Sequence, residues 1–231
     1  MSLAPSIQYV LTDIEGTTTS ISFVYDVLFP YFRKEIPKII SMQEDPEIIT
    51  IIEDTKSIAK IMDKKELTSI EEVIDVLLEW SLEDKKITPL KTLQGILWKN
   101  GYVSGELKGN VFPDVAPALK KWKSEGCKIG VFSSGSVAAQ KLIFGYSESG
   151  DLTPLFSHYF DTNTGGKRDV ETYKKIARLI EIQPKQILFL SDIVEELEAA
   201  KKADYQTIQL VRPGTISNWN TTALSFDTIT V

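Results

Sequence analysis

Short apolar runs alternate with segments of helical periodicity along most of the chain. The runs are IQYVL (7–11), CKIGVF (127–132), FSHYF (156–160), QILFL (186–190) and QTIQLV (206–211). Apolar residues recur three or four positions apart in VAPALKKWKSEG (115–126), VAAQKLIFG (137–145), DVETYKKIARLIE (169–181) and IVEELEAAKKAD (193–204). This alternation predicts an α/β fold with a doubly wound parallel sheet, because parallel strands need crossover helices. Gly126 is placed as a helix stop, and the closing ALSFDTITV (223–231) predicts an edge strand.

One interval breaks this rhythm, because far more chain than one crossover helix separates the first run from CKIGVF. It contains further stretches with helical spacing, VYDVLFPYFRKEIPKII (24–40), PEIITIIEDTKSIAKIMD (46–63), SIEEVIDVLLEWSLED (69–84) and LKTLQGILWKNG (90–101). No strand pattern lies among them. We therefore expect an all-helical module over 21–104, inserted into an α/β domain made of 1–20 and 105–231.

Composition narrows the function. The chain has 231 residues, 42% of them hydrophobic, which suffices for a sizeable core. Its net charge of −6 argues against a nucleic-acid partner. The sequence has neither a signal-peptide pattern nor a membrane-length apolar run, so we expect a cytoplasmic protein. Cys127 is the only cysteine of the sequence and His158 its only histidine, which excludes an intramolecular disulfide and a Cys/His zinc site.

Acidic residues follow the first apolar run. Asp13 and Glu15 stand in YVLTDIEGTTTS, where a strand gives way to a loop. Ligands of open α/β sheets bind at the carboxyl ends of strands, so this location suits chemistry. An ordinary turn or helix cap is the alternative interpretation of Asp before Gly-Thr.

Polar residues also follow the later strands. Ser133 and Ser134 in GVFSSGS precede a helix start that suits an anion, although serines there are often simple N-caps. Lys167 follows two glycines in DTNTGGKRD, and a solvated surface lysine is the alternative. Asp192 ends QILFLSD, where it either caps the next helix or binds a cation. Carboxylates, hydroxyls and an ammonium would thus converge on one crevice. Facing carboxylates repel unless a cation lies between them, and oxygen ligands favour Mg²⁺.

The ordered set DIEGT, SS, Lys167 and SD resembles the haloacid dehalogenase superfamily of Mg²⁺-dependent phosphatases. Members of that superfamily carry a helical cap inserted after the first motif, on a Rossmann-like core. Most have a second aspartate where this chain has Glu15, and Ser191 stands where a glycine is more usual. The Glu15 departure, with DIEGTTTSISFVYDVLFPYF, LKGNVFPDV and FSSGSVAAQKLIFG, resembles the enolase-phosphatase (acireductone synthase) family of methionine salvage.

The resemblance implies a role for each matching residue. Asp13 would be the nucleophile and Glu15 the general acid/base, with its main-chain carbonyl toward the metal. Asp13, Glu15 and Asp192 would hold Mg²⁺, and Glu196 would lie in the outer shell around it. Ser133, Ser134 and Lys167 would bind the phosphoryl group of the substrate, and Lys167 would also be catalytic.

The implied activity is conversion of 2,3-diketo-5-methylthiopentyl 1-phosphate to an acireductone and phosphate. A phosphatase of the same superfamily acting on another small phosphate ester is the alternative; a receiver domain or a binding module with a relic site is disfavoured. The partner is a small-molecule phosphate ester, with no membrane or nucleic acid, and a monomer is expected. A cytoplasmic location is compatible with nuclear presence. Phe23, Tyr25 and Trp98 are candidates for recognising the methylthio group, with a core role as the alternative.

Overall fold

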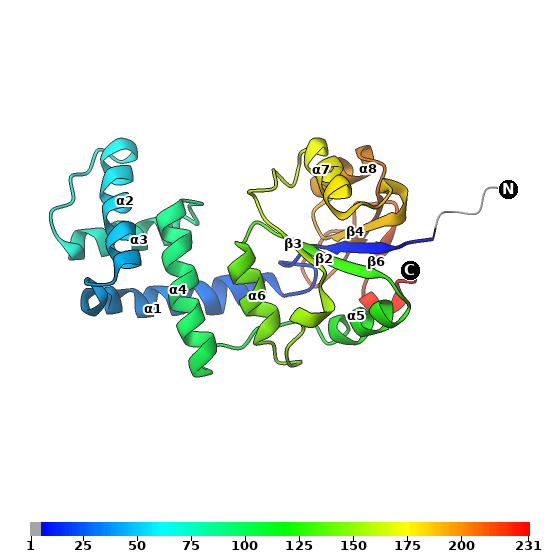
Figure 1. The fold of residues 1–231 in the computed structure, drawn as a ribbon, viewed down its shortest axis with the longest axis horizontal. Helices are drawn as coiled ribbons and strands as arrows, with labels where there is room; N and C mark the ends of the chain where they lie inside the picture. Colours follow the sequence, from blue (N-terminus) through cyan, green and yellow to red (C-terminus); the bar gives the residue numbers. More distant parts are fainter. Residues whose placement is uncertain (1–5) are drawn as a thin grey trace. The chain divides into compact units, whose positions relative to one another are not determined.

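The computed structural model describes residues 6–231, and these divide into two compact units (Figure 1). The first combines Met1–Ile21 with Lys108–Val231, and the second is Ser22–Leu107. The second unit is thus an insertion into the first.

The first unit contains a six-stranded parallel sheet. Its strands are β1 (Tyr9–Thr12), β2 (Lys128–Phe132), β3 (His158–Phe160), β4 (Ile187–Ser191), β5 (Gln206–Leu210) and β6 (Thr222–Ala223). They lie in the order β3-β2-β1-β4-β5-β6. The chain moves outward from β1 to β3 and then returns to the other side of β1 to form β4. This reversal creates the crevice between β1 and β4 in which open α/β sheets bind ligands.

Helices connect the strands from β1 to β5, as the sequence predicts, and a loop connects β5 to β6. The helices are α5 (Val115–Ser124), α6 (Val137–Gly145), α7 (Val170–Ile180) and α8 (Val194–Lys202). Figure 1 shows α7 and α8 on one face of the sheet and α5 on the other. The predicted doubly wound α/β fold with an inserted helical module is therefore confirmed. Short 3₁₀ turns complete the unit: η3 (Thr153–Leu155), η4 (Pro184–Gln186) and η5 (Phe226–Thr228).

Burial on both faces explains the continuous apolar runs. The core between the sheet and the α7/α8 layer includes Tyr9, Leu11, Phe132, Tyr173 and Phe189. Strands covered on both faces need apolar residues at successive positions, unlike half-exposed strands. The helix ends also follow their sequence signals, because Ser136 Oγ caps α6 at Ala139 N and Gly126 has a φ of +87° just beyond α5.

The closing segment differs from its prediction. Only Thr222–Ala223 is a strand, at the β5 edge of the sheet, and most of ALSFDTITV is not extended. Ser225 Oγ accepts the N–H of Asp227 and starts η5 instead. The aromatic ring of Phe226 stacks on that of Trp122 at a centroid distance of 5.4 Å. A local cap and a tertiary contact thus override the alternating pattern.

All regular elements of the inserted unit, residues 22–107, are helices. Its elements are η1 (Phe23–Leu28), α1 (Phe29–Glu35), η2 (Ile36–Met42), α2 (Pro46–Met62), α3 (Ile70–Leu82) and α4 (Thr88–Ser104). The predicted stretch 24–40 is not one regular helix, since η1 is a π-helix and η2 a 3₁₀-helix. Pro30 and Pro37 lie at these junctions, and proline has no N–H for the i→i−4 bond.

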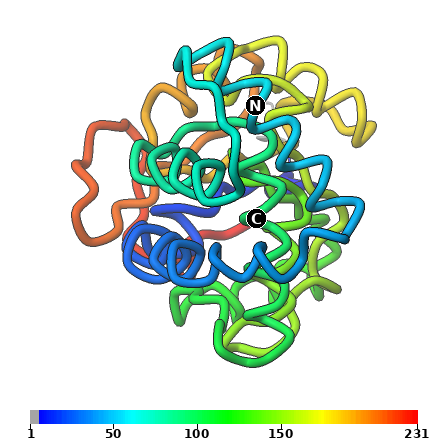
Figure 2. The backbone as a smooth tube through the Cα atoms, turned by 90° about the vertical axis from the view of Figure 1, so that its left-hand side faces the viewer, coloured from blue at the N-terminus to red at the C-terminus, as the bar shows by residue number. Residues whose placement is uncertain are grey.

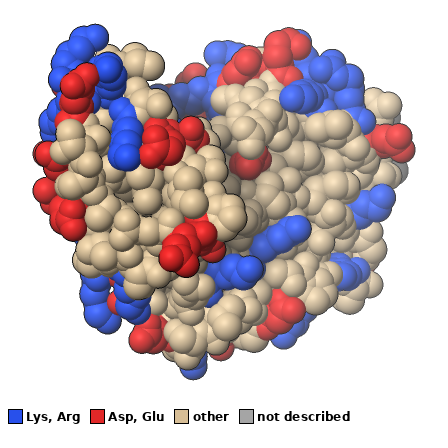
Figure 3. Space-filling view, turned by 60° about the vertical axis from the view of Figure 1, so that its left-hand side comes forward, with Lys and Arg blue, Asp and Glu red and all other residues tan. Residues whose placement is uncertain are grey.

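The surface carries mixed charge. Figure 3 shows Lys and Arg interspersed with Asp and Glu on the face that it draws. Cys127 is a buried free thiol, and His158 Nδ1 lies 3.0 Å from Tyr9 Oη. No helix within residues 6–231 is long and apolar enough to cross a membrane.

Candidate active site

The site lies at the β1–β4 crevice. Asp13 follows β1 directly, and its N–H donates to Leu190 O of β4 at 2.9 Å. Asp192 follows the last residue of β4. The parallel pairing of the two strands therefore brings both carboxylate-bearing loops to the same edge of the sheet.

A tight loop, residues 13–19, carries the first two acids. Ile14 O accepts the N–H groups of Thr17, Thr18 and Thr19, which folds the loop back on itself. Gly16 has a φ of +75°, and a Cβ atom built there would lie 2.3 Å from Asp192 Oδ2. Glycine is thus required both for the backbone conformation and for the close approach of the second carboxylate.

Asp13 is buried, with 2% of its surface exposed, and its carboxylate is firmly held. Its Oδ1 accepts from Ile14 N at 2.7 Å and lies 2.6 Å from Lys167 Nζ. Lys167 Nζ also lies 2.8 Å from Glu196 Oε2. From the sequence, a solvated surface lysine is the alternative interpretation of Lys167. In the structure only 8% of its side-chain surface is exposed.

Two acids fix the charge on Lys167. Burial alone lowers the pKa of its ammonium group, but the carboxylates of Asp13 and Glu196 raise it well above the ordinary value. Tyr173 Oη donates to Lys167 O at 2.6 Å and so holds its backbone. Lys167 is therefore a permanent, oriented positive charge beside Asp13.

Glu196 lies against Lys167 and β4. Its Oε2 also accepts from Ser191 Oγ at 3.0 Å, so Ser191 contributes a hydroxyl where a glycine would contribute nothing. Burial and then the negative charge of Asp13 raise the pKa of Glu196 to about 7. The contacts of Glu196 support the orientation of Lys167. Its expected place around the metal stays a prediction.

Glu15 contacts the second strand's serine. Ser133 Oγ donates to Glu15 Oε2 at 3.2 Å and accepts from Gly135 N at 3.1 Å. Burial and then the charge of Asp13 raise the pKa of Glu15 above its ordinary value. Ser134 is exposed one residue further on, at the loop before α6. The structure thus brings Asp13, Glu15, Ser133, Lys167 and Asp192 into one electrostatic cluster.

One carboxylate oxygen of Asp192 makes no hydrogen bond to the described residues. Its Oδ1 is buried and has no hydrogen-bond partner among the described residues. Burial, followed by the charge of Asp13, raises its pKa to about 7. A buried carboxylate with an unmatched oxygen beside another carboxylate is stabilised by a cation. The residues present therefore fit a hard divalent ion with oxygen ligands.

Side chains alone do not complete a metal cage. Within residues 6–231, no group of at least three Asp, Glu, His or Cys side chains is positioned to hold a metal ion. A set of two carboxylates and one main-chain carbonyl, such as the predicted Asp13, Glu15 and Asp192, contains only two metal-binding side chains. Water and substrate oxygens usually complete such a set for Mg²⁺.

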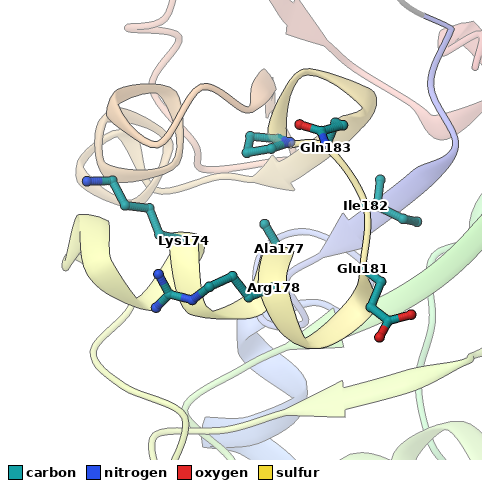
Figure 4. Close-up of a pocket in the computed structure, with 7 residues that line it drawn as sticks. Lys174, Ala177, Arg178, Glu181, Ile182 and Gln183 are labelled. Atoms are coloured by element: carbon teal, nitrogen blue, oxygen red, sulfur yellow. The ribbon is translucent and has the colours of Figure 1, made fainter.

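A cavity of about 560 Å³ opens beside Asp192. The loop between β5 and β6 forms one side of it, including Gly214, Thr215, Ile216 and Asn218. Figure 2 shows this loop in orange-red. A second cavity, of about 440 Å³, lies at the end of α7 (Figure 4). Its lining contains none of the predicted site residues: Lys174, Ala177, Arg178, Glu181, Ile182, Gln183 and Pro184.

Sequence reasoning missed several residues that support this cluster. Thr17 Oγ1 accepts from Asp192 N at 3.0 Å, and Gln209 Nε2 donates to Asp192 O at 3.0 Å. Arg212 Nε donates to Thr17 O at 3.0 Å. The chain signals none of these pairings in advance, because the partners are far apart in sequence and meet only through the strand order.

Comparison with known proteins agrees with this geometry. A family model of haloacid dehalogenase-like hydrolases matches residues 7–204. An enolase-phosphatase E1 from Picosynechococcus sp. is 52% identical over 92% of this chain and 92% of its own length. One from Pseudomonas fluorescens is 48% identical over 90% and 91%. The crystal structure of the Saccharomyces cerevisiae UTR4 protein is similar with a TM-score of 0.82 and 33% identity, over 97% of this chain and 100% of that one. The chain therefore belongs to the enolase-phosphatase family of haloacid dehalogenase-like hydrolases.

Proposed function

We propose that this enolase-phosphatase converts 2,3-diketo-5-methylthiopentyl 1-phosphate to the acireductone 1,2-dihydroxy-3-keto-5-methylthiopentene and phosphate. The observation that carries the proposal is the buried Asp13 carboxylate, 2.6 Å from Lys167 Nζ and beside an acid of raised pKa, Glu15. Nucleophile, cation and acid then lie together at the end of β1. A two-step phosphoryl transfer through a covalent intermediate requires these three groups.

Phosphoryl transfer would begin at Asp13. Its carboxylate attacks phosphorus, an Asp13 phosphoanhydride forms, and the bond from phosphorus to the substrate oxygen breaks. Glu15, protonated when it takes the carbon proton in the preceding enolisation, gives its proton to the departing oxygen; its raised pKa helps it to hold this proton between the two steps. The Glu15 carboxylate then takes a proton from the water that attacks phosphorus, which releases phosphate and restores Asp13.

The chain offers oriented donors for the phosphoryl oxygens. Lys167 carries a positive charge beside Asp13, and Ser133 lies at the start of the loop before α6. We assign phosphoryl binding to Lys167, Ser133 and Ser134 together with N–H groups of that loop. Asp13, the Glu15 main-chain carbonyl and Asp192 would hold Mg²⁺. When bound, this ion supplies a positive charge that polarises the phosphoryl group and offsets the repulsion between Asp13 and Asp192.

Enolisation precedes phosphoryl transfer. A base takes the proton from the carbon that bears the phosphate ester, the electrons of the broken C–H bond form the enolate, and the enolate oxygen takes a proton from water to give the enol. We assign the proton removal to Glu15, because its longer side chain reaches further from the β1 loop than an aspartate would. Lys167 would offset the developing negative charge.

Three residues of the inserted unit, Phe23, Tyr25 and Trp98, are the candidates for recognising the methylthio group. Of the three candidates, Phe23 and Trp98 are buried within this unit, and Trp98 Nε1 donates to Leu28 O at 2.9 Å. Tyr25 is 52% exposed, and its hydroxyl lies 3.4 Å from Asp84 Oδ2. These features favour Tyr25 for substrate contact and a core role for the other two. The monomeric state and the cytoplasmic location stay predictions.

The test follows both steps in a single turnover. Enzyme, Mg²⁺ and the diketone phosphate are mixed while enol absorbance and free phosphate are recorded together. Glu15→Gln should slow both steps, by about 100-fold or more for loss of an acid/base group. Glu15→Asp should retain more phosphatase than enolase activity. A non-enolisable phosphate ester isolates the second step, and Glu171→Gln, at an exposed position of α7, is the matched control.

Two results would contradict the proposal. Enol formation at the wild-type rate in Glu15→Gln would assign the base to another residue. Phosphate release from the ester without any enol signal from the diketone phosphate would leave a simple phosphatase of the same superfamily.

A further inference from the structure

Thr17 contributes a buried hydrogen bond between the two loops that carry Asp13 and Asp192. Its side chain accepts the N–H of Asp192 through Oγ1 at 3.0 Å. Its main-chain oxygen accepts from Arg212 Nε, also at 3.0 Å. Thr17 is completely buried, so water does not replace either bond. The position of one loop relative to the other therefore depends on what holds Thr17.

Arg212, just after β5, is itself rigidly held. Its guanidinium makes a bidentate pair with Asp114, with Nη1–Oδ1 at 3.1 Å and Nη2–Oδ2 at 2.8 Å. Nη1 also donates to Leu224 O. The guanidinium carbon lies 4.2 Å from the centre of the Phe112 ring. A buried, planar group with this many partners has one orientation, which directs Nε at Thr17 O.

Gln209, near the end of β5, holds the other loop. Its amide Nε2 donates to Asp192 O and to Ile216 O, both at 3.0 Å, and its Oε1 accepts from Asn218 N at 3.0 Å. Gln209 is 1% exposed. The same side chain therefore fixes the Asp192 backbone and the loop that lines the cavity beside it.

We propose that Arg212 and Gln209 are positioning residues that set the separation of Asp13 and Asp192, and thereby the affinity for the divalent cation. Neither touches the reacting atoms. Arg212 acts through Thr17 O, and Gln209 acts through Asp192 O. This inference rests on the proposed metal site. Removal of residues that orient metal ligands typically weakens metal binding about 10- to 100-fold.

The substitution Arg212→Lys separates this role from simple charge. Lysine keeps a cation near Asp114, but one ammonium group cannot pair with both oxygens of Asp114 and reach Thr17 O as well. Gln209→Met is the second variant, with a side chain of similar length that lacks the amide. Ile180→Ala is the control, because Ile180 is buried in the α7 core and is not part of these contacts.

The experiment measures the Mg²⁺ concentration that gives the half-maximal rise in Tm of the full chain, without substrate. We expect that concentration to increase about tenfold in Arg212→Lys and Gln209→Met, and to be unchanged in Ile180→Ala although its Tm is lower. In turnover assays at saturating substrate, the Mg²⁺ requirement should rise by the same factor, while KM for the phosphate ester at saturating Mg²⁺ stays near wild type.

The outcomes are distinct. Wild-type Mg²⁺ dependence in the two variants, or an equal shift in Ile180→Ala, would overturn the positioning role and leave the metal site intact. Absence of any Mg²⁺ response in the wild-type protein would overturn the proposed metal site and this inference with it. If Arg212→Lys does not fold, Gln209→Met decides the question alone.

Discussion

Two buried groups of charged side chains in the first unit differ in how completely their positive and negative charges match. At Asp114 one carboxylate meets one guanidinium, and Phe226 N adds a further hydrogen bond at 2.7 Å. Burial alone would raise the pKa of Asp114, but Arg212 and this N–H lower it. At the end of β1, the buried ammonium group of Lys167 lies among several acids, and Asp192 and Glu196 both have pKa values raised to about 7.

The difference shows what each group is for. In the Asp114–Arg212 pair one negative charge matches one positive charge, and the pair joins the start of α5 to the end of β5. The β1 cluster has more negative charge than its lysine neutralises, and it has an unmatched oxygen on Asp192. This excess of negative charge lowers the stability of the fold, and a bound cation would neutralise it. One group therefore stabilises the fold, and the other is prepared for a ligand.

Asp13→Asn should have the largest effect, and this effect should be on catalysis and not on stability. We expect at least a thousandfold loss of phosphate release, about 4 kcal/mol of barrier, because an amide is a poor nucleophile. Stability should not fall, because the substitution removes one of the repelling charges. Steady-state kinetics and urea unfolding measure the two quantities. Asp169→Asn at the exposed N-cap of α7 is the matched control. Near-normal turnover of Asp13→Asn would remove Asp13 from the nucleophile's role.

Asp114→Asn should show the opposite pattern. Loss of one partner leaves the Arg212 charge uncompensated, so the free energy of unfolding should fall by about 3 kcal/mol. The folded-state pKa of Asp114 is depressed. Its stabilisation is therefore complete above the unfolded pKa of about 4 and is lost as pH falls through the folded value. Urea unfolding at pH 7 and pH 3 tests this, and an equal difference between wild type and variant at both pH values would contradict it.

Mg²⁺ should stabilise the β1 cluster and leave the Asp114 pair unaffected. At a concentration of 100 times Kd, a cation that binds only the folded state adds about 2.7 kcal/mol. Wild type and Asp169→Asn at the exposed N-cap of α7 should both gain this increment, whereas Asp192→Asn should lose most of it. Thermal unfolding with Mg²⁺ or with a chelator gives the comparison. Full activity in the chelator would rule out the metal requirement.

The smallest effect concerns two tyrosines. Tyr173→Phe removes the bond to Lys167 O, and Tyr205→Phe removes a bond of 2.8 Å to Tyr173 O. Each should cost about 1 kcal/mol of stability. Only Tyr173→Phe should also lower kcat, by a few-fold, because it loosens the backbone of Lys167. Equal kcat values in the two variants would show that this hydrogen bond serves stability alone.

The sequence predicted the site where local pattern sufficed. Asp13, Ser133 and Asp192 follow apolar strands directly, so the alternation of elements places them at one edge of the sheet. Lys167 follows no strand directly, and its burial depends on the acids that receive it. Arg212 and Gln209 carry no local signal, because their partners, Thr17 and Asp192, are brought near only by the order of the strands. Polar contacts between distant segments are a property of topology rather than of pattern.

The same limit applies to the ends of elements. Apolar alternation predicted a strand over 223–231, yet a serine cap and the burial of Phe226 gave a 3₁₀ turn. Helical periodicity predicted helical structure over 24–40, and two prolines divide this stretch into π, α and 3₁₀ segments. Periodicity reports which face is buried, and the backbone donors decide the hydrogen-bond pattern.

The central position of β1 also has a consequence for synthesis of the protein. Tyr9 pairs with Lys128 on one side and with Ile187 on the other, so this first strand has no partner until most of the chain has left the ribosome. Closing such long loops is entropically costly, and contacts distant in sequence slow folding. During this interval the apolar segment of β1 is an unpaired strand available to other chains. We expect nascent or truncated forms that end before β2 to aggregate, with β1 as the segment responsible.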